Sequence, residues 1–230
     1  MLDLYANKGS ALPQKLTITA LELGFIAFSY FLLFGDGDAI ISSLFGWPVL
    51  ENTPARRGII FAFNLIILAR MGVMMFMFLK RQIPWSEALS VPVAFAIYYV
   101  GFAILVLPNS APLGTFDYVG IGIFALGCIL NTGSEWQRHI FKSDPANKGK
   151  LFTGGLFAYS MHINFFGDVL WVLGYAMIAG HLFGYALPIL LLSFFAFFNV
   201  PKLDDYLRAR YGQPFKNYET ATKRLIPFVW

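Results

Sequence analysis

The chain has 230 residues, of which 57% are hydrophobic and only 13% are charged. Soluble domains carry about 25% charged residues, so this composition excludes an ordinary soluble globular domain. The formal net charge of +4 lies in a few clusters beside long apolar runs, which favours the basic flanks of membrane helices and argues against nucleic-acid binding.

Six apolar runs approach the roughly 20 residues that a helix needs to cross a bilayer. The first follows the polar residues 7–15 and has no small-residue cleavage site, so we expect a retained span. A shorter seventh run, residues 39–50, contains Gly46, Trp47 and Pro48 and fits either a partial helix or a re-entrant segment. The six runs cover residues 16–34, 58–79, 88–108, 116–131, 165–180 and 185–200.

The pattern predicts an all-α, multi-pass membrane bundle of six or seven transmembrane helices, in a bacterial inner membrane or an endoplasmic reticulum. Loops rich in Lys and Arg stay in the cytoplasm. Six spans place the N-terminus and the three main basic segments on that side, whereas the loops at 109–115 and 181–184 contain no Lys or Arg. Arg56 and Arg57 are the exception to this topology.

Polar chemistry is concentrated in the second half of what we expect to be a single membrane domain. Residues 1–130 are mostly hydrophobic segments with few polar side chains. Residues 131–230 alternate charged residues with glycines and aromatic residues. Cys128 is the only cysteine and lies in an apolar run, so we interpret it as a packing residue. No spacing of Cys or His predicts a metal site.

One polar constellation starts where the fourth main run ends. If the helix continues, Asn131, Glu135, Arg138 and Lys142 share one face, because they are spaced by four, three and four residues. This face fits a juxtamembrane segment that meets anionic headgroups. It equally fits a site where Arg and Lys bind the phosphates of a ligand.

A second constellation opens the fifth run. Asp168 stands in apolar surroundings, with Asn164 one helical turn earlier and His162 close by. An ionisable group at membrane depth indicates function, although Asn164 or Asp168 would also serve as a helix N-cap. A single histidine such as His162 is more often structural. The tail after residue 202 is too charged to cross lipid and predicts a short amphipathic helix at the cytoplasmic mouth.

Residues 131–230 resemble the C-terminal domain of the steroid 5-alpha-reductase family, which is similar to sterol reductases and isoprenylcysteine carboxyl methyltransferases. The resemblance rests on short motifs in the family's order: Asn131, Ser134, Glu135 and Lys142; Gly154-Gly155-Leu156-Phe157 with Tyr159; Asn164-Phe165-Phe166-Gly167-Asp168; Gly174-Tyr175; Tyr206-Leu207; and Ile226-Pro227-Phe228.

This resemblance implies an NADPH-dependent reductase that transfers a hydride to the carbon–carbon double bond of a lipid-soluble enone, a steroid or another. It implies that Arg138 and Lys142 meet the phosphates and that Asn164 and Asp168 hold the nicotinamide amide. The cofactor-binding residues it suggests are Asn131, Glu135, Arg138, Lys142, Tyr159, Asn164, Asp168, Tyr175 and Tyr206. Residues 131–230 would bind the cofactor, and the helices of residues 1–130 would receive the substrate.

The related methyltransferases usually present Arg-His-Pro followed by an aromatic residue and a glycine. Here Met161 and Ile163 flank His162, so both the Arg and the Pro are missing and the reductase is favoured. Methylation from S-adenosylmethionine is the alternative, and a non-catalytic lipid-binding or transport bundle is a third interpretation.

Reductases of steroid enones hold the carbonyl with a glutamate near a proline and with a tyrosine a few residues before an arginine. Glu51 with Pro54 resembles the first feature, and Glu51 is our predicted catalytic acid. Arg70 resembles the arginine, but Ile67 stands where the tyrosine is expected. This mismatch argues against a steroid substrate, or else another tyrosine substitutes, such as Tyr98 or Tyr99.

Overall fold

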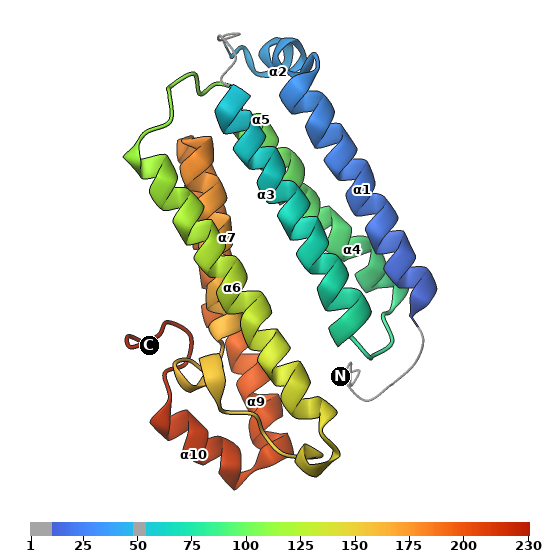
Figure 1. The fold of residues 1–230 in the computed structure, drawn as a ribbon, viewed down its shortest axis with the longest axis vertical. Helices are drawn as coiled ribbons and strands as arrows, with labels where there is room; N and C mark the ends of the chain where they lie inside the picture. Colours follow the sequence, from blue (N-terminus) through green and yellow to red (C-terminus); the bar gives the residue numbers. More distant parts are fainter. Residues whose placement is uncertain (1–10, 48–53) are drawn as a thin grey trace. The chain divides into compact units, whose positions relative to one another are not determined.

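The structure is a computed structural model that describes residues 11–47 and 54–230 (Figure 1). Within these residues it is all-helical, without an extended β-strand, which confirms the predicted all-α class. The chain divides into two compact units. Unit 1 comprises residues 1–118 and 175–184, and unit 2 comprises residues 119–174 and 185–230.

Unit 1 is built on a long N-terminal helix, α1, which packs against α3 and α4. Buried Ile18, Met75 and Ile83 form one of its apolar clusters. The first residues of α6 and the last residues of α7 also belong to this unit. Its main elements are α1 (Leu12–Phe34), α2 (Gly37–Phe45), α3 (Pro54–Val73), η1 (Met74–Phe78), α4 (Trp85–Ala96), η2 (Ile97–Gly101) and α5 (Phe102–Val106).

Unit 2 contains most of α6 and α7 together with the tail, where α9 packs against α10. Buried Val169, Phe195, Val200 and Leu225 form one of its apolar clusters. Its elements are α6 (Thr115–Ser143), η3 (Pro145–Asn147), η4 (Gly155–Ala158), α7 (Ile163–Ala179), η5 (Leu182–Tyr185, mostly in unit 1), α8 (Ala186–Phe194), η6 (Phe195–Asn199), α9 (Val200–Tyr211) and α10 (Gln213–Ala221).

Each of the six long predicted runs lies on a helical segment, apart from one or two residues at the end of some runs. Five helical segments are long and apolar enough to cross a membrane, and α7 is a shorter apolar helix. The seventh run contains α2, whose nine residues rise only about 14 Å against a hydrocarbon core of roughly 30 Å. In its described part, the seventh run is therefore a partial helix. The five segments are Leu12–Phe34, Pro54–Phe78, Trp85–Val106, Thr115–Ser143 and Leu182–Tyr211.

Arg56 and Arg57, the exception to the charge pattern, are buried at 4% and 2% exposure. Arg56 forms an ion pair with Asp117 and donates to the carbonyl of Ile178 at 2.7 Å. Arg57 donates to Asp38 Oδ1 at 2.8 Å. Both guanidinium charges are therefore neutralised inside unit 1. The positive-inside rule concerns exposed loop cations, so it does not apply to these two residues.

Glycines let α6 and α7 approach closely within unit 2. A Cβ atom at Gly127 would lie 2.4 Å from the backbone nitrogen of Trp171, and one at Gly167 would lie 2.6 Å from that of Asn131. Any larger residue would push the two backbones apart. This contact positions the polar side chains of both helices beside one another.

Candidate functional site

The polar residues of α6 and α7 form one hydrogen-bonded group. Asn131 Nδ2 donates to Asp168 Oδ1 at 2.9 Å and to the Asn164 carbonyl at 3.1 Å. Asn164 Nδ2 donates to Glu135 Oε1 at 3.0 Å. We call Asn131, Glu135, Asn164 and Asp168 the α6–α7 network. Trp171 Nε1 joins it by donating to Asp168 Oδ1 at 2.8 Å.

The network is held within an apolar bundle. Asn131, Glu135 and Asn164 are each less than 9% exposed, and Asp168 is half-buried. Helix α7 begins at Ile163, so Asp168 lies in its second turn and does not cap it. The side chain of Asn164 donates across to α6 rather than capping its own helix. The capping interpretation is therefore wrong for both residues.

The C-terminal end of α6 is cationic. The helix runs unbroken to Ser143, which confirms that Asn131, Glu135, Arg138 and Lys142 share a helical spacing. Arg138 forms an ion pair with Glu135. Lys142 is exposed, and its Nζ donates to the Tyr211 hydroxyl at 2.8 Å.

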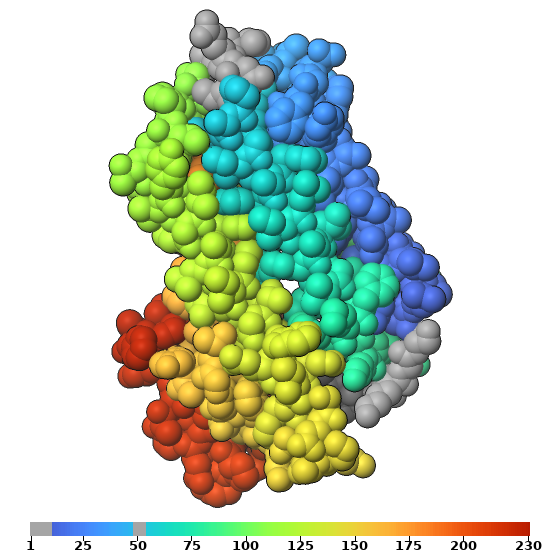
Figure 2. All heavy atoms as spheres, in the orientation of Figure 1, coloured from blue at the N-terminus to red at the C-terminus, as the bar shows by residue number. Residues whose placement is uncertain are grey.

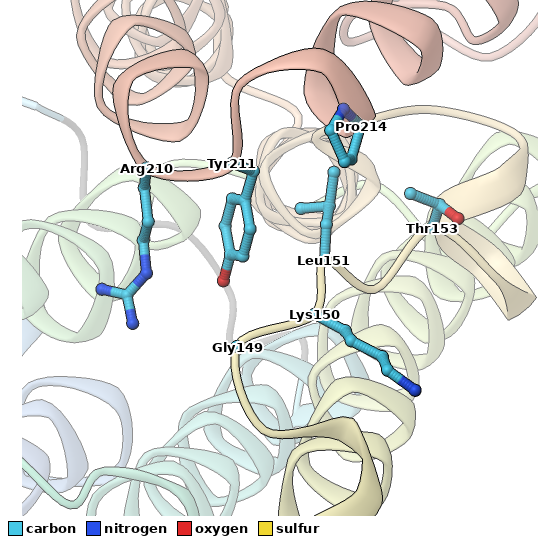
Figure 3. Close-up of a pocket in the computed structure, with 7 residues that line it drawn as sticks. All are labelled: Gly149, Lys150, Leu151, Thr153, Arg210, Tyr211 and Pro214. Atoms are coloured by element: carbon cyan, nitrogen blue, oxygen red, sulfur yellow. The ribbon is translucent and has the colours of Figure 1, made fainter.

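A basic pocket of about 410 Å³ lies between the loop after α6 and the end of α9, both in unit 2. Figure 3 shows Arg210 and Tyr211 side by side on α9, and Lys150 on the loop with its amine directed away from both. Lys142 adds a further cation through its bond to Tyr211. The pocket thus offers several donors to an anion. Its lining is Gly149, Lys150, Leu151, Thr153, Arg210, Tyr211 and Pro214.

The turn that contains Gly154 and Gly155 is hydrogen-bonded to α6 through Gln137. Gly155 has φ +59°, and a Cβ atom there would lie 2.2 Å from Gln137 Oε1. That same oxygen accepts a hydrogen bond from the backbone N–H of Leu156 at 2.8 Å. The turn therefore requires glycine both for its backbone conformation and for the approach of Gln137.

The tail is bonded to the start of α7, and in Figure 2 its red spheres lie against the yellow-orange segment that precedes α7. Asp204, which is fully buried, lies 2.7 Å from His162 Nε2 and accepts from Arg224 Nε at 2.7 Å. The Tyr218 hydroxyl donates to the carbonyl of Phe157, and burial raises the pKa of Tyr218. The predicted single tail helix is replaced by two helices: α9, which continues from η6 without a break, and α10.

Three further predicted site residues, Tyr159, Tyr206 and Tyr175, have described partners outside the network. Tyr159 is 55% exposed and makes an edge contact with the ring of Phe228. Tyr206 is a partner of Arg210 on α9. Tyr175 belongs to unit 1, where its buried hydroxyl donates to Asn64 Oδ1 at 2.9 Å.

Glu51 lies outside the described residues. Among those described, no group of three His, Cys, Asp or Glu side chains is placed to hold a metal ion. Sequence reasoning missed three partners: Trp171, Gln137 and Asp204. Trp171 follows Asp168 by one helical turn, which is a usable signal. Nothing in the local sequence points from His162 to Asp204, because 42 residues separate them.

These features define the class as an all-helical protein with five helical segments long and apolar enough to cross a membrane, a polar network between α6 and α7, and a basic end on α6. The chain belongs to the DUF1295 family, described as a protein of unknown function, whose profile matches residues 64–222.

Curated relatives include enzymes of two reaction classes. A probable O-methyltransferase of Ustilaginoidea virens is 38% identical over 40% of this chain and 34% of its own length. A Delta(14)-sterol reductase of Schizosaccharomyces pombe is 30% identical over 46% of this chain and 28% of its own. The 3-oxo-5-alpha-steroid 4-dehydrogenase 2 of Sus scrofa is 28% identical over 49% of this chain and 42% of its own. The matches thus span less than half the length of each relative.

Proposed function

We propose that this protein is an NADPH-dependent membrane reductase that transfers a hydride to the carbon–carbon double bond of a lipid-soluble enone. The α6–α7 network carries the proposal. It combines amide donors and carboxylate acceptors at membrane depth, where polar groups are expensive and usually serve a function. Similarity to a sterol reductase and to steroid dehydrogenases supports the same reaction class.

The donor set of the network fits a nicotinamide. A carboxamide presents one carbonyl acceptor and two N–H donors. Asn131 and Asn164 supply side-chain amides, and Glu135 and Asp168 supply carboxylates, so both halves of a carboxamide find a complementary group. These side chains bond to one another, and a bound carboxamide would exchange some of these bonds for its own.

The cationic end of α6 and the basic pocket fit the phosphates of a dinucleotide. Arginine and lysine are the usual partners of phosphate, Arg through paired N–H groups and Lys as a point charge. Arg138 and Lys142 would meet the diphosphate, and Arg210 would hold an additional phosphate. When bound, NADPH supplies the hydride, and the protein orients it and excludes water.

An acid of the N-terminal half completes the proposal. Glu51, which the family resemblance suggests, would act in its protonated form: it would polarise the enone carbonyl and donate its proton to the developing enolate oxygen. The substrate would reach it from the bilayer through the helices of residues 1–130. Residues 131–230 would bind the cofactor.

Methyl transfer from S-adenosylmethionine is a second candidate, and the similarity to a probable O-methyltransferase favours it. In this case the same acidic and amide side chains would meet the charged ammonium and carboxylate of the methyl donor. The acceptor would be a lipid-soluble molecule.

The two candidates separate in a thermal-shift comparison of the purified protein with NADPH and with S-adenosylmethionine. We expect stabilisation by NADPH, by about 2.7 kcal/mol at a hundred times its Kd, and none by the methyl donor. Asn164→Ala should remove the NADPH shift. Asn109→Ala is the matched control, because Asn109 also makes a side-chain bond, to the Ala179 carbonyl at 3.0 Å, but lies in unit 1.

Stabilisation by S-adenosylmethionine alone would favour the methyltransferase. An Asn164→Ala protein that binds NADPH like the wild type would mean that the network is only structural.

A further inference from the structure

A closed turn in the tail of unit 2 exposes large apolar side chains. The backbone N–H of Ile226 donates to the backbone oxygen of Trp230 at 2.7 Å, and the N–H of Trp230 donates back to the Ile226 carbonyl at 3.0 Å. Although the turn is closed by these bonds, Phe228 and Val229 are 77% and 71% exposed, and Trp230 is exposed as well. We call residues 226–230 the aromatic loop.

The backbone of the aromatic loop is strained at Phe228. Among the described residues, Phe228 is the only one other than glycine with a positive φ, which is +66°. An aromatic residue is unfavourable in this left-handed region, and such strain often marks a functional segment. The Phe228 ring is directed outward, where it makes an edge contact with the ring of Tyr159. The strained turn therefore presents the ring at the surface, so burial in the core does not account for it.

The aromatic loop lies at the level where helix α7 begins. The N–H of Met161 donates to the Lys223 carbonyl at 2.8 Å, and the N–H of His162 donates to the Arg224 carbonyl at 3.1 Å. Helix α7 is apolar, and its 17 residues rise about 26 Å, close to the roughly 30 Å of a hydrocarbon core. Its start therefore fits a boundary between hydrocarbon and headgroups. Figure 1 shows the C-terminal segment extending to the side of α6 and α7 at this level.

Helix α6 marks the same level independently. Asn164, in the first turn of α7, donates from Nδ2 to Glu135 Oε1 at 3.0 Å, so Glu135 lies level with the start of α7. The next residue, Trp136, is exposed. Tryptophan is enriched at membrane–water interfaces, because its ring is apolar while its N–H group reaches water. Two separate segments of unit 2 thus place exposed aromatic side chains at one level.

The root of the aromatic loop is continuous with apolar helices. Leu225 is fully buried in a cluster with Val169 of α7 and Phe195 of η6, and Ile226 packs against that cluster. Segment Leu182–Tyr211, which contains η6, is long and apolar enough to cross a membrane. The loop therefore emerges from the membrane helices themselves. Exposed Lys223 precedes it, and lysine at this position is suited to anionic headgroups.

We propose that the aromatic loop docks into the lipid interface of the membrane that the helices cross. Phe228 and Val229 insert among the headgroups and upper acyl chains, and Lys223 meets anionic headgroups. Docking holds the segment that is bonded to the start of α7 against the membrane. The inference does not depend on the proposed function, because a reductase and a methyltransferase would both carry the loop in the same place.

The test measures the depth of a nitroxide attached at Val229→Cys in a Cys128→Ala background. The full chain is placed in nanodiscs of phosphatidylcholine and phosphatidylserine, without NADPH. Collisions of the nitroxide with oxygen, which dissolves in lipid, and with a water-soluble nickel chelate report its depth. We expect the label to lie about 5–10 Å into the boundary between headgroups and acyl chains, as interfacial apolar groups do.

Two further label positions provide the references. Asn217→Cys is the matched control, because Asn217 is exposed on α10 of the same tail, and its label should stay in water. Leu190→Cys gives the value for a lipid-facing position, because Leu190 is exposed on α8 within a membrane-crossing segment. The ratio of oxygen to nickel collisions at Val229 should lie above that at Asn217.

Substitutions at Phe228 separate lipid docking from a purely structural turn. Phe228→Ser should move the Val229 label toward the value of Asn217, whereas Phe228→Trp, which keeps an interfacial aromatic side chain, should leave the depth unchanged. A Val229 label that meets nickel as often as the Asn217 label would overturn the proposal, as would an unchanged depth in Phe228→Ser. Protection from both reagents would also overturn it, because a second copy of the chain or another protein would then cover the loop. Since no cofactor is added, failure here would leave the proposed function untouched.

Discussion

Asn164 and Asp168 show how single polar side chains are kept in an apolar bundle. Each is bonded to a residue of α6, and Asp168 also accepts from Trp171. Unpaired, such groups would cost about 1–3 kcal/mol each. Because Asn164 and Asp168 are paired, burying them does not carry this cost. A ligand with matching donors and acceptors could take the place of some of these bonds.

Glu51 carries the clearest prediction for a single residue. In the proposed mechanism it donates to the developing negative charge and touches only the substrate. Glu51→Gln should therefore keep NADPH binding and reduce turnover of an enone by about a hundredfold or more. The measurement is NADPH oxidation at saturating cofactor. Glu87→Gln is the control, because Glu87 is already paired with Arg81; equal turnover in both variants would remove Glu51 from the mechanism.

At the scale of elements, the contact between α6 and α7 determines where the network forms. Gly167 lies against the backbone of α6, where a Cβ atom would be only 2.6 Å from the Asn131 nitrogen. The polar residues lie on α6 and α7, and the glycines determine how closely the two helix backbones approach. That spacing allows the polar side chains to form hydrogen bonds with one another.

Gly167→Ala should force the helices apart and destabilise the protein by about 1–3 kcal/mol. Gly122→Ala on α6 is the matched control, because a methyl there meets no atom within 4 Å, and alanine stabilises a helix interior by up to ~1 kcal/mol relative to glycine. Thermal unfolding of the two variants should give shifts of opposite sign. Equal shifts would contradict the close contact.

The tail contains two neighbouring aspartates in different environments, which also serve as a test and its control. Asp204 is buried between His162 and Arg224, whereas Asp205 is 77% exposed and pairs only with Arg208 among the described residues. Removing one partner of a buried ion pair costs about 3–5 kcal/mol, while exposed pairs contribute roughly 0–1 kcal/mol.

Asp204→Asn should therefore release the tail, and Asp205→Asn should not. Limited proteolysis of residues 204–225 measures this directly, with faster cleavage expected only for Asp204→Asn. Cleavage at the wild-type rate in both variants would show that the apolar contacts of Phe215 and Leu225 hold the tail without the ion pairs.

For the whole molecule, the charge pattern predicts the orientation in the membrane. Arg56 and Arg57 are neutralised in unit 1, and a six-span topology would place the remaining basic clusters on one side, as the positive-inside rule requires. The loop that contains Lys148 should face the cytoplasm, and the loop that contains Ser110 should face the opposite side.

Single-cysteine labelling tests this orientation, because Cys128 is the only native cysteine. In a Cys128→Ala background, an impermeant maleimide added outside intact cells should label Ser110→Cys but not Lys148→Cys. Permeabilised cells provide the control for both. Labelling of Lys148→Cys in intact cells would reverse the proposed topology.

The sequence by itself determined the fold class, the helical runs and the continuous spacing from Asn131 to Lys142. These follow from composition, bilayer thickness and helical periodicity, all of which act along the chain. It also singled out Asn164 and Asp168, because an acid in an apolar run is conspicuous.

Only the tertiary structure decided which polar groups meet. It paired His162 with Asp204, placed Tyr175 with Asn64 in unit 1, and left Glu22 and Tyr99 buried together without partners among the described residues. These outcomes depend on how separate helices pack. Packing is set by shape across the bundle, for which the local sequence carries no periodic signal.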